Sequence, residues 1–172
     1  MIYKITTYEI EIAIANYFGI RENIIVPNIS WGIKIHECDL LIIRKSGCGV
    51  EVEIKISKSD LKADFKKKHN HIDPYNRIKE FYFAIPDYLE DCLPLIPEHA
   101  GVISVSRNII AGTIHTECRM IRKCKINTKA VKFCDNEIIK IAHLGTMRFW
   151  NSRINYNELK RKVNGFQQLL EM

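Results

Sequence analysis

The sequence predicts an α/β fold of mixed α+β character, in which a central mixed β-sheet is flanked by helices. Three observations predict this class. Residues 38–56 hold two hydrophobic segments on either side of a Gly-containing turn, a pattern typical of a β-hairpin. Segments with helix-capping residues stand before and after this hairpin. Further short hydrophobic segments, bounded by Pro or Gly, follow it and can add strands to the same sheet.

The first element we expect is a helix over residues 6–18, with the sequence TTYEIEIAIANYF. Thr6 or Thr7 can cap its N-terminus, and Gly19 can end it. The Ile-rich alternation inside this segment is also compatible with a strand. A short strand can follow at residues 24–26, immediately before a proline.

The hairpin is expected from two strands, Asp39–Lys45 and Val50–Ile56. Folding the chain about residues 46–49 brings Asp39 near residue 55 or 56. The sequence does not fix this register to one residue, because a bulge can shift it.

The remaining elements complete the sheet and its helical cover. A helix is expected to start near Asp60, with Ser57 or Ser59 as its cap. The later segments predict, in order, a strand at Phe81–Ile85, a helix or turn at Asp87–Leu95, a strand at Gly101–Ser106, a strand at Ile109–Thr113 or Thr116–Ile121, and helices at 128–150 and 155–171.

The chain shows no internal repeat and no Gly/Ser linker, and 47% of its 172 residues are hydrophobic. A chain of this length and composition can bury the core of one domain. We therefore expect a single domain over residues 1–172, with a basic, mainly helical C-terminal part from about residue 128.

Charge is distributed unevenly along the chain. Residues 1–106 hold 13 Lys and Arg against 15 Asp and Glu, a net of −2, whereas residues 107–172 hold 13 against 5, a net of +8. A basic C-terminal third suggests a polyanionic partner. An ordinary solvated basic surface explains the same charges equally well.

The sequence contains no apolar segment of the roughly 18 residues that a membrane-spanning helix needs. Its N-terminus lacks the basic stretch and apolar run of a secretory signal. A cytoplasmic protein that does not contact membranes is the default expectation.

The second hairpin strand carries the most informative pattern. Side chains alternate between the two faces of a strand, so the Val and Ile residues from Val50 to Ile56 share one apolar face. Glu51, Glu53 and Lys55 share the other face. Such a charged face is often merely solvated, and that interpretation stays open.

Asp39, Glu53 and Lys55 can converge at one end of the hairpin, and their chemistry is complementary. Two carboxylates supply the hard oxygen ligands that Mg²⁺, or Mn²⁺ in its place, prefers. Such a metal polarises a phosphate and helps to form hydroxide from water. A lysine beside it can stabilise the negative charge that builds on the phosphate.

The pattern D39-x13-E53-x-K55 resembles the motif of the PD-(D/E)XK nuclease superfamily. The segment from Cys38 to Pro86 is similar to bacterial DNA-repair proteins of the MmcB type. The shared features are Glu53, Lys55, Ser57, Asp60, Asp64 and the strand FYFAIP. The resemblance covers the middle third of the chain and implies a restriction-endonuclease-like core with the element order α-β-β-β-α-β.

The resemblance also implies a function. We expect a Mg²⁺- or Mn²⁺-dependent deoxyribonuclease acting in DNA repair, recombination or restriction, with Asp39, Glu53 and Lys55 as catalytic residues. Asp39 and Glu53 would hold the metal, within about 4–6 Å of each other. Members of the superfamily often add a glutamate from the first helix, and Glu9 is slightly preferred to Glu11. Cys38 stands where the superfamily often has proline.

Two basic clusters are candidates for contacts with DNA phosphates. Their members are Lys66, Lys67 and Lys68 after the second helix, and Arg148, Lys160, Arg161 and Lys162 near the C-terminus. Solvated helix ends explain both clusters as well.

Two other functions remain open. The chain can be a DNA-binding module that keeps a nuclease fold without robust turnover, or a protein-interaction subunit whose charged strand face is solvated. Asp39 and Glu53 pointing apart would favour the protein-interaction subunit. A homodimer is compatible with all three functions.

Overall fold

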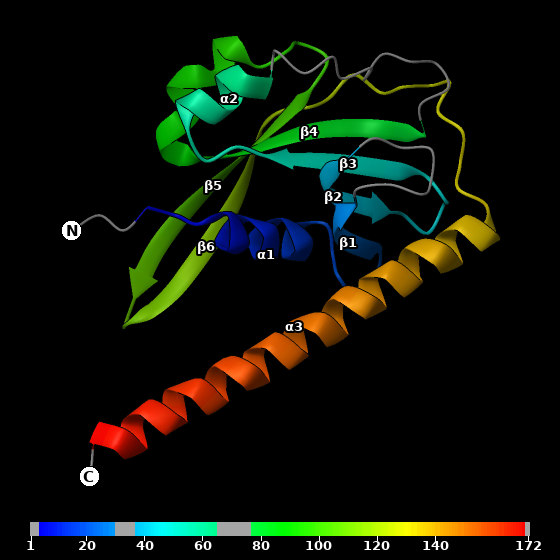
Figure 1. Ribbon diagram of the computed structural model, residues 1–172. Coiled ribbons are helices and arrows are strands. Elements are labelled where there is room, and N and C mark those ends of the chain that lie inside the picture. Colours follow the sequence, from blue (N-terminus) through cyan, green and yellow to red (C-terminus); the bar gives the residue numbers. More distant parts are fainter. Residues whose placement is uncertain (1–3, 30–36, 65–76, 171–172) are drawn as a thin grey trace.

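The computed structural model describes residues 4–29, 37–64 and 77–170, except for the side chains of residue 64 and of residues 165–170. Its elements, labelled in Figure 1, are α1 (Thr7–Tyr17), β1 (Ile24–Ile29), β2 (Cys38–Ile43), β3 (Gly49–Ile54), α2 (Lys58–Asp64), β4 (Ile78–Pro86), the 3₁₀ helix η1 (Asp87–Leu95), β5 (Gly101–Ile110), β6 (Thr113–Arg122) and α3 (Asp135–Leu170).

Within the described ranges, the strands form one mixed six-stranded sheet in the order β1-β2-β3-β4-β5-β6. β4 pairs in parallel with both β3 and β5, and the other neighbours pair antiparallel. Helices flank this sheet (Figure 1). The structure therefore confirms the predicted fold class.

The two faces of the sheet bury separate hydrophobic clusters. On one face, α1 packs Ile10 and Ile14 against the sheet residues Leu40 and Val52. On the other face, the sheet presents Leu41, Phe81, Phe83 and their neighbours to Leu61 of α2, Leu89 of η1 and Ile141 of α3. Burial of both faces accounts for the hydrophobic character of the central strands.

α1 forms as its caps predict. Thr6 is the N-cap residue and completes a capping box with Glu9, which satisfies free backbone amides at the helix start. Gly19 follows the helix with φ 78°, a left-handed conformation that glycine adopts without strain. Local capping chemistry thus decides between the helix and the strand that the Ile-rich alternation also allowed.

The predicted β2–β3 hairpin is present, with its turn over residues 44–48. Gly47 takes φ 79° in that turn and donates its N–H to the carbonyl oxygen of Arg44. β3 ends at Ile54, two residues earlier than expected. Ile56 is consequently exposed, so its predicted place on the apolar face is wrong.

β1 and the β5–β6 hairpin are longer than the sequence suggested. β1 continues through Pro27 to Ile29, which is possible because β1 lies at the edge of the sheet, where a missing N–H does not break a ladder. β5 and β6 are joined by a two-residue turn, Ala111–Gly112, in which both residues have positive φ.

The two predicted C-terminal helices are one helix of 36 residues, α3, which begins at Asp135 rather than near residue 128. Residues 123–134 form no regular element, and Phe133 from this segment packs into the core. No Pro or Gly stands between residues 150 and 155, so nothing in the chain interrupts the helix there. Within the described ranges, no helix is long and apolar enough to cross a membrane.

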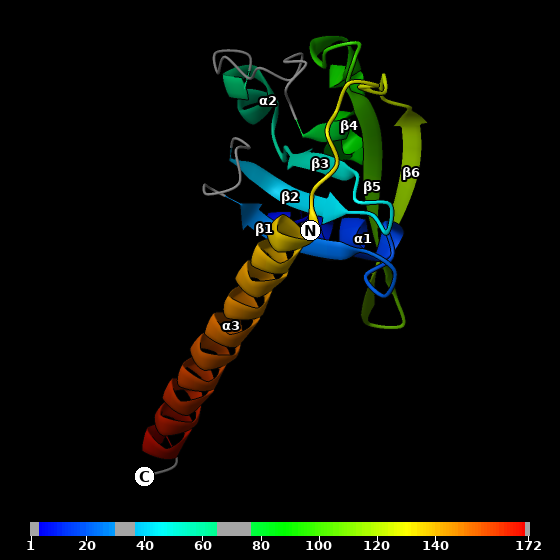
Figure 2. The ribbon, with the colours of Figure 1, turned by 90° about the vertical axis from the view of Figure 1, so that its right-hand side faces the viewer.

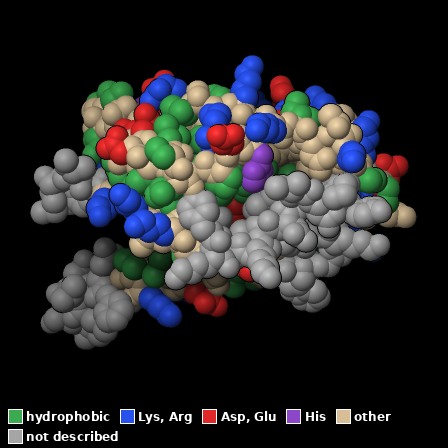
Figure 3. Space-filling model, turned by 90° about the horizontal axis from the view of Figure 1, so that it is seen from above, with side chains coloured by type: hydrophobic (Ala, Val, Ile, Leu, Met, Phe, Trp, Pro, Cys, Tyr) green, Lys and Arg blue, Asp and Glu red, His purple; other side chains and the backbone are tan. Residues whose placement is uncertain are grey.

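The distal part of α3 leaves the domain. In Figures 1 and 2, which are related by a 90° turn, α3 runs past β1 and its C-terminal half stands clear of the sheet. On the described part of the face seen from above, Lys and Arg side chains are interspersed with Asp and Glu (Figure 3).

Candidate active site

The β2–β3 hairpin brings the two predicted acids close together. Leu40 pairs with Val52 and Leu41 with Glu51, so Asp39 and Glu53 stand immediately beyond the end of this ladder, where the charge of Asp39 acts on Glu53. Residues directly opposite in an antiparallel pair point to the same face. The register therefore brings Asp39 to Glu53, instead of to residue 55 or 56 as the hairpin length had suggested.

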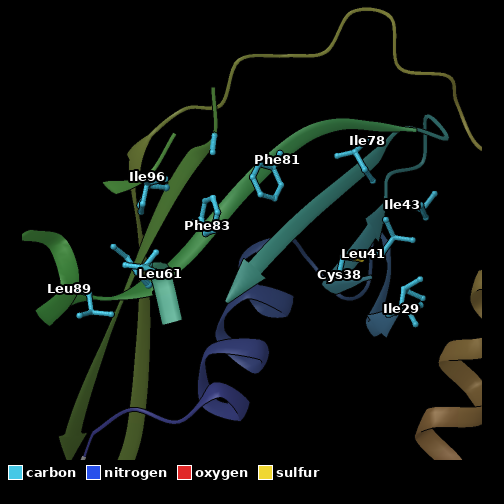
Figure 4. Packing of buried hydrophobic residues seen from close by; sticks show 14 of the residues in the cluster. Ile29, Cys38, Leu41, Ile43, Leu61, Ile78, Phe81, Phe83, Leu89 and Ile96 are labelled. Atoms are coloured by element: carbon cyan, nitrogen blue, oxygen red, sulfur yellow. The ribbon is translucent and has the colours of Figure 1, made fainter. Parts of the chain in front are cut away.

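This site lies on the sheet face that carries Leu41, Phe81 and Phe83, opposite to α1. Figure 4 shows these apolar side chains on β2 and β4, the strands on either side of β3. Glu51 pairs with Phe81 and Glu53 with Phe83 in the parallel β3–β4 ladder. The acids of β3 thus stand among aromatic and aliphatic side chains, where water is scarce.

The charged side chains of this face are buried. The exposed fractions are 1% for Glu51, 5% for Glu53 and 5% for Lys55, while Asp39 is half-buried. The hypothesis of a merely solvated charged face is therefore wrong. Buried charges are costly for folding unless they are paired or hold an ion, so their presence here calls for a specific role.

Hydrogen bonds fix the orientation of the predicted residues. The backbone N–H of Ile54 donates to Oδ2 of Asp39 over 2.7 Å. The Lys55 ammonium donates to Oε2 of Glu53 over 2.9 Å, and both side chains are buried. The backbone N–H of Lys55 donates to the carbonyl oxygen of Ala84 over 3.0 Å, which holds Lys55 against β4 just beyond the end of β3.

Burial and mutual repulsion alter the acidity of the groups in this site. Burial, followed by repulsion from Asp39, raises the pKa of Glu53 to about 7, although the neighbouring Lys55 ammonium opposes the rise. The pKa of the Cys38 thiol is raised by burial and then by the carboxylates of Glu51, Glu53 and Asp39. A cation at this position would relieve the repulsion.

Of the two glutamates on α1, Glu11 is the one whose pKa the site affects. Burial and then the charge of Asp39 raise the pKa of Glu11. Glu9 is engaged elsewhere: one oxygen closes the capping box with Thr6, and the other accepts a hydrogen bond from Arg107 over 2.8 Å. The contacts of Glu9 are thus with Thr6 and Arg107, and the predicted role of Glu9 or Glu11 as a metal ligand stays a prediction.

The donor set fits a hard divalent cation only in part. Asp39 and Glu53 offer carboxylate oxygens on one face, and Mg²⁺ commonly binds one or two protein carboxylates together with water and phosphate oxygens. Among the described residues, no three His, Cys, Asp or Glu side chains are already assembled as a metal-binding group. A metal at Asp39 and Glu53 would therefore depend on oxygens from water and from the substrate.

Ser57 and Asp60 serve the local structure of α2. The hydroxyl of Ser57 accepts a hydrogen bond from the Asp60 N–H over 3.1 Å, as an N-cap does. Oδ2 of Asp60 accepts from the Ile56 N–H over 3.4 Å. The side chain of Asp64 and all of Lys66, Lys67 and Lys68 lie outside the described residues.

The C-terminal basic residues divide into two groups. Arg148 donates to the carbonyl oxygen of Asn28 and so attaches α3 to β1. Lys160, Arg161 and Lys162 are exposed on the part of α3 that has left the domain. The structure thus gives Arg148 a contact within the fold, while the predicted DNA contacts of all four residues stay predictions.

Glu51 and Cys38 are the site residues that the motif did not indicate. Strand alternation had already placed Glu51 on the same face as Glu53, so this signal was present in the sequence. Its burial was not predictable, because it depends on how the chain packs above β3. Cys38 is buried beside these acids at the start of β2.

The fold has a structural relative. The chain is similar to SPO1766, a protein of unknown function from Silicibacter pomeroyi, with a TM-score of 0.54 and 11% sequence identity over 86% of this chain and 88% of that chain. A likeness at this identity concerns the fold alone. Neither a protein-family model nor a curated protein sequence matches the chain.

Proposed function

We propose that this protein is a metal-dependent DNA nuclease whose active site is the buried acidic face of the β2–β3 hairpin. One observation carries the proposal: Asp39 and Glu53 stand close together at the end of the β2–β3 ladder, with Lys55 bound to Glu53, in an environment that raises the pKa of Glu53 to about 7. Strongly perturbed acids beside a lysine are a common mark of catalytic sites.

The pattern and the chain order support this proposal. The motif D39-x13-E53-x-K55 falls on two paired strands, and the elements from α1 to β4 follow the order α-β-β-β-α-β that the nuclease resemblance implies. The function itself rests on the chemistry of the site, because one fold can serve many functions.

In the proposed reaction, a bound Mg²⁺ or Mn²⁺ supplies polarisation of the scissile phosphate and a reactive water. Asp39 and Glu53 would hold that ion through their carboxylate oxygens. Lys55, whose ammonium contacts Glu53, would stabilise the negative charge that develops on the phosphate. The apolar surroundings strengthen each of these electrostatic interactions.

A DNA-binding module without robust turnover is the second candidate. It is favoured by the contact between Lys55 and Glu53, which engages one of the two carboxylates, and by the lack of a ready-made metal group among the described residues. The two functions differ in one measurable property, which is cleavage of bound DNA.

The decisive experiment compares the wild type with Asp39→Ala on single-stranded, duplex, flap and junction DNA. We expect cleavage with Mg²⁺ or Mn²⁺, none with EDTA, and a loss of about 10²-fold or more in the variant, since a metal ligand should matter at least as much as its supporting partners. Asp91→Ala, at an exposed position on η1, is the matched control. Binding without cleavage by the wild type would favour the second candidate.

A further inference from the structure

The distal part of α3 exposes a face that a folded protein normally buries. Every described side chain from Phe149 to Asn164 is exposed, and the group includes Tyr156, Leu159 and Val163. The whole helix of 36 residues is about 54 Å long, and its contacts with the domain include those of Ile141 and Arg148, which precede Phe149. A projecting helix gains little stability from its own sequence, so tertiary or partner packing is expected to hold it.

The exposed apolar side chains continue the face that α3 already uses. Ile138 and Ile141 pack against the core, and a Cβ added to Gly145 would meet Val26 at 3.2 Å. With 3.6 residues per turn, Tyr156 and Leu159 lie on the same side of the helix as these residues. The positions Phe149, Tyr156 and Val163 are also seven apart, and Ser152 and Leu159 alternate with them, as in the seam of a coiled coil.

Cations border this seam on both sides. Arg153 and Lys160 follow one edge of the seam, and Lys162 stands at the other edge. Glu158 is the one acid between residues 149 and 164, and it lies away from the seam. The seam, defined by Phe149, Ser152, Tyr156, Leu159 and Val163, therefore joins an apolar centre to positively charged borders.

We infer that this seam binds an amphipathic helix of a partner protein that carries acidic residues on both borders of its own apolar stripe. Charge decides between the occupants. A second α3 would bring cations against cations along the borders, which disfavours that pairing. Duplex DNA would satisfy the cations, but its phosphate backbone offers no apolar surface to Tyr156, Leu159 and Val163. An acidic amphipathic helix satisfies both the apolar seam and its borders.

The test uses the full chain and two labelled synthetic peptides of about three heptads, with Leu at the seam positions. One peptide has Glu at both borders and the other has Lys. We expect the acidic peptide to bind, to weaken as salt is added, and to bind at least about tenfold more tightly than the basic one. Equal binding of the two peptides, or binding of neither, would overturn the inference.

Matched variants locate the contact on the helix. Leu159 is 61% exposed within the seam, whereas Ile154 is 54% exposed on the opposite side of α3. Leu159→Ser should weaken binding of the acidic peptide about tenfold or more, and Ile154→Ser should leave it unchanged. Both variants should unfold at the temperature of the wild type, because neither side chain packs on the domain.

Two outcomes would assign the seam to another occupant. If light scattering shows a dimer that Leu159→Ser dissociates, a second copy fills the seam. If Leu159→Ser weakens binding of duplex DNA as much as it weakens peptide binding, DNA fills it. Either result would overturn the inference, while the nuclease proposal, which rests on the β2–β3 hairpin, would be unaffected.

Discussion

Glu53 and Lys55 form a buried ion pair, and this environment determines how the residues of the site can be tested. Removing one member of a buried pair leaves the other charge without its partner and can unfold a protein for reasons unrelated to catalysis. A solvated strand face would tolerate such substitutions without harm to the fold. The observed burial requires substitutions that preserve volume instead.

Replacing Glu53 and replacing Lys55 should have different effects on metal affinity and turnover. Glu53→Gln removes a charged metal ligand, so metal affinity and turnover should both decrease, and added metal should restore part of the activity. Lys55→Met keeps the volume and leaves the carboxylates in place, so the metal should still bind. Turnover should nevertheless fall by about 10²–10³-fold, as when a preorganised donor to a developing anion is removed.

Calorimetric metal titration beside DNA cleavage rates distinguishes the two effects. Lys55→Arg keeps the charge but not the compact ammonium, so it should recover only part of the activity. Wild-type cleavage by Lys55→Met would show that Lys55 has only a structural role and would remove the main support for the motif.

The raised pKa of Glu53 predicts a dependence of stability on pH in metal-free buffer. The folded state holds the Glu53 proton up to about pH 7, whereas the unfolded chain releases it near 4.5. The associated stability is complete below about pH 4.5 and is lost as the pH rises through 7, by up to about 3 kcal/mol. Urea unfolding at pH 5 and 7.5 should therefore show a smaller change for Glu53→Gln than for the wild type. If the free energy of unfolding changes equally between the two pH values in the wild type and in Glu53→Gln, burial does not hold the proton on Glu53.

α1 shows how one element can serve both the fold and the site. Its first turn uses Glu9 for the capping box and for the ion pair with Arg107, whereas in its next turn the charge of Asp39 helps to raise the pKa of Glu11. The separation follows from helical geometry, because residues two positions apart do not share a face.

Substitutions of the two glutamates of α1 should therefore have opposite effects on stability and on metal affinity. Glu9→Ala removes the capping-box partner and the Arg107 ion pair, so the free energy of unfolding should decrease by about 1 kcal/mol while metal affinity is unchanged. Glu11→Ala should leave stability unchanged or higher in metal-free buffer and weaken metal binding. Urea unfolding and metal titration of both variants provide the comparison. A drop in metal affinity for Glu9→Ala alone would assign the ligand role to Glu9.

The elements that local chemistry specifies were predictable from the sequence. Thr6 and Gly19 marked α1, and the Gly-containing turn with alternating residues marked the hairpin. The pairing of Asp39 with Glu53 was not predictable, because the register depends on the conformation of a turn that includes Gly47. The burial of Glu51 was missed because tertiary packing decides it. The continuity of α3 could have been predicted, because no Pro or Gly stands between residues 150 and 155.

At the scale of the whole molecule, the acidic site and the basic charge occupy different parts. The acids lie on the sheet, while residues 107–172 carry a net charge of +8 and end in a helix that leaves the domain. A DNA-processing enzyme needs an attractive surface outside its acidic centre, because the substrate is a polyanion. The exposed cations of α3 can supply part of that attraction.

This separation predicts that the α3 cations contribute to DNA affinity and not to the chemical step. Charge reversal of Lys160, Arg161 and Lys162 together should weaken DNA binding. The slope of log affinity against log salt concentration should also decrease in magnitude by about 1 for each phosphate that the variant no longer binds. Cleavage at saturating DNA should remain near the wild-type rate, because these residues lie far along α3 from the hairpin. Leu159→Ser is the control on the same helix, since it changes the seam without changing charge. An unchanged salt slope in the charge-reversal variant would show that these cations are only solvated and that DNA binds the protein elsewhere.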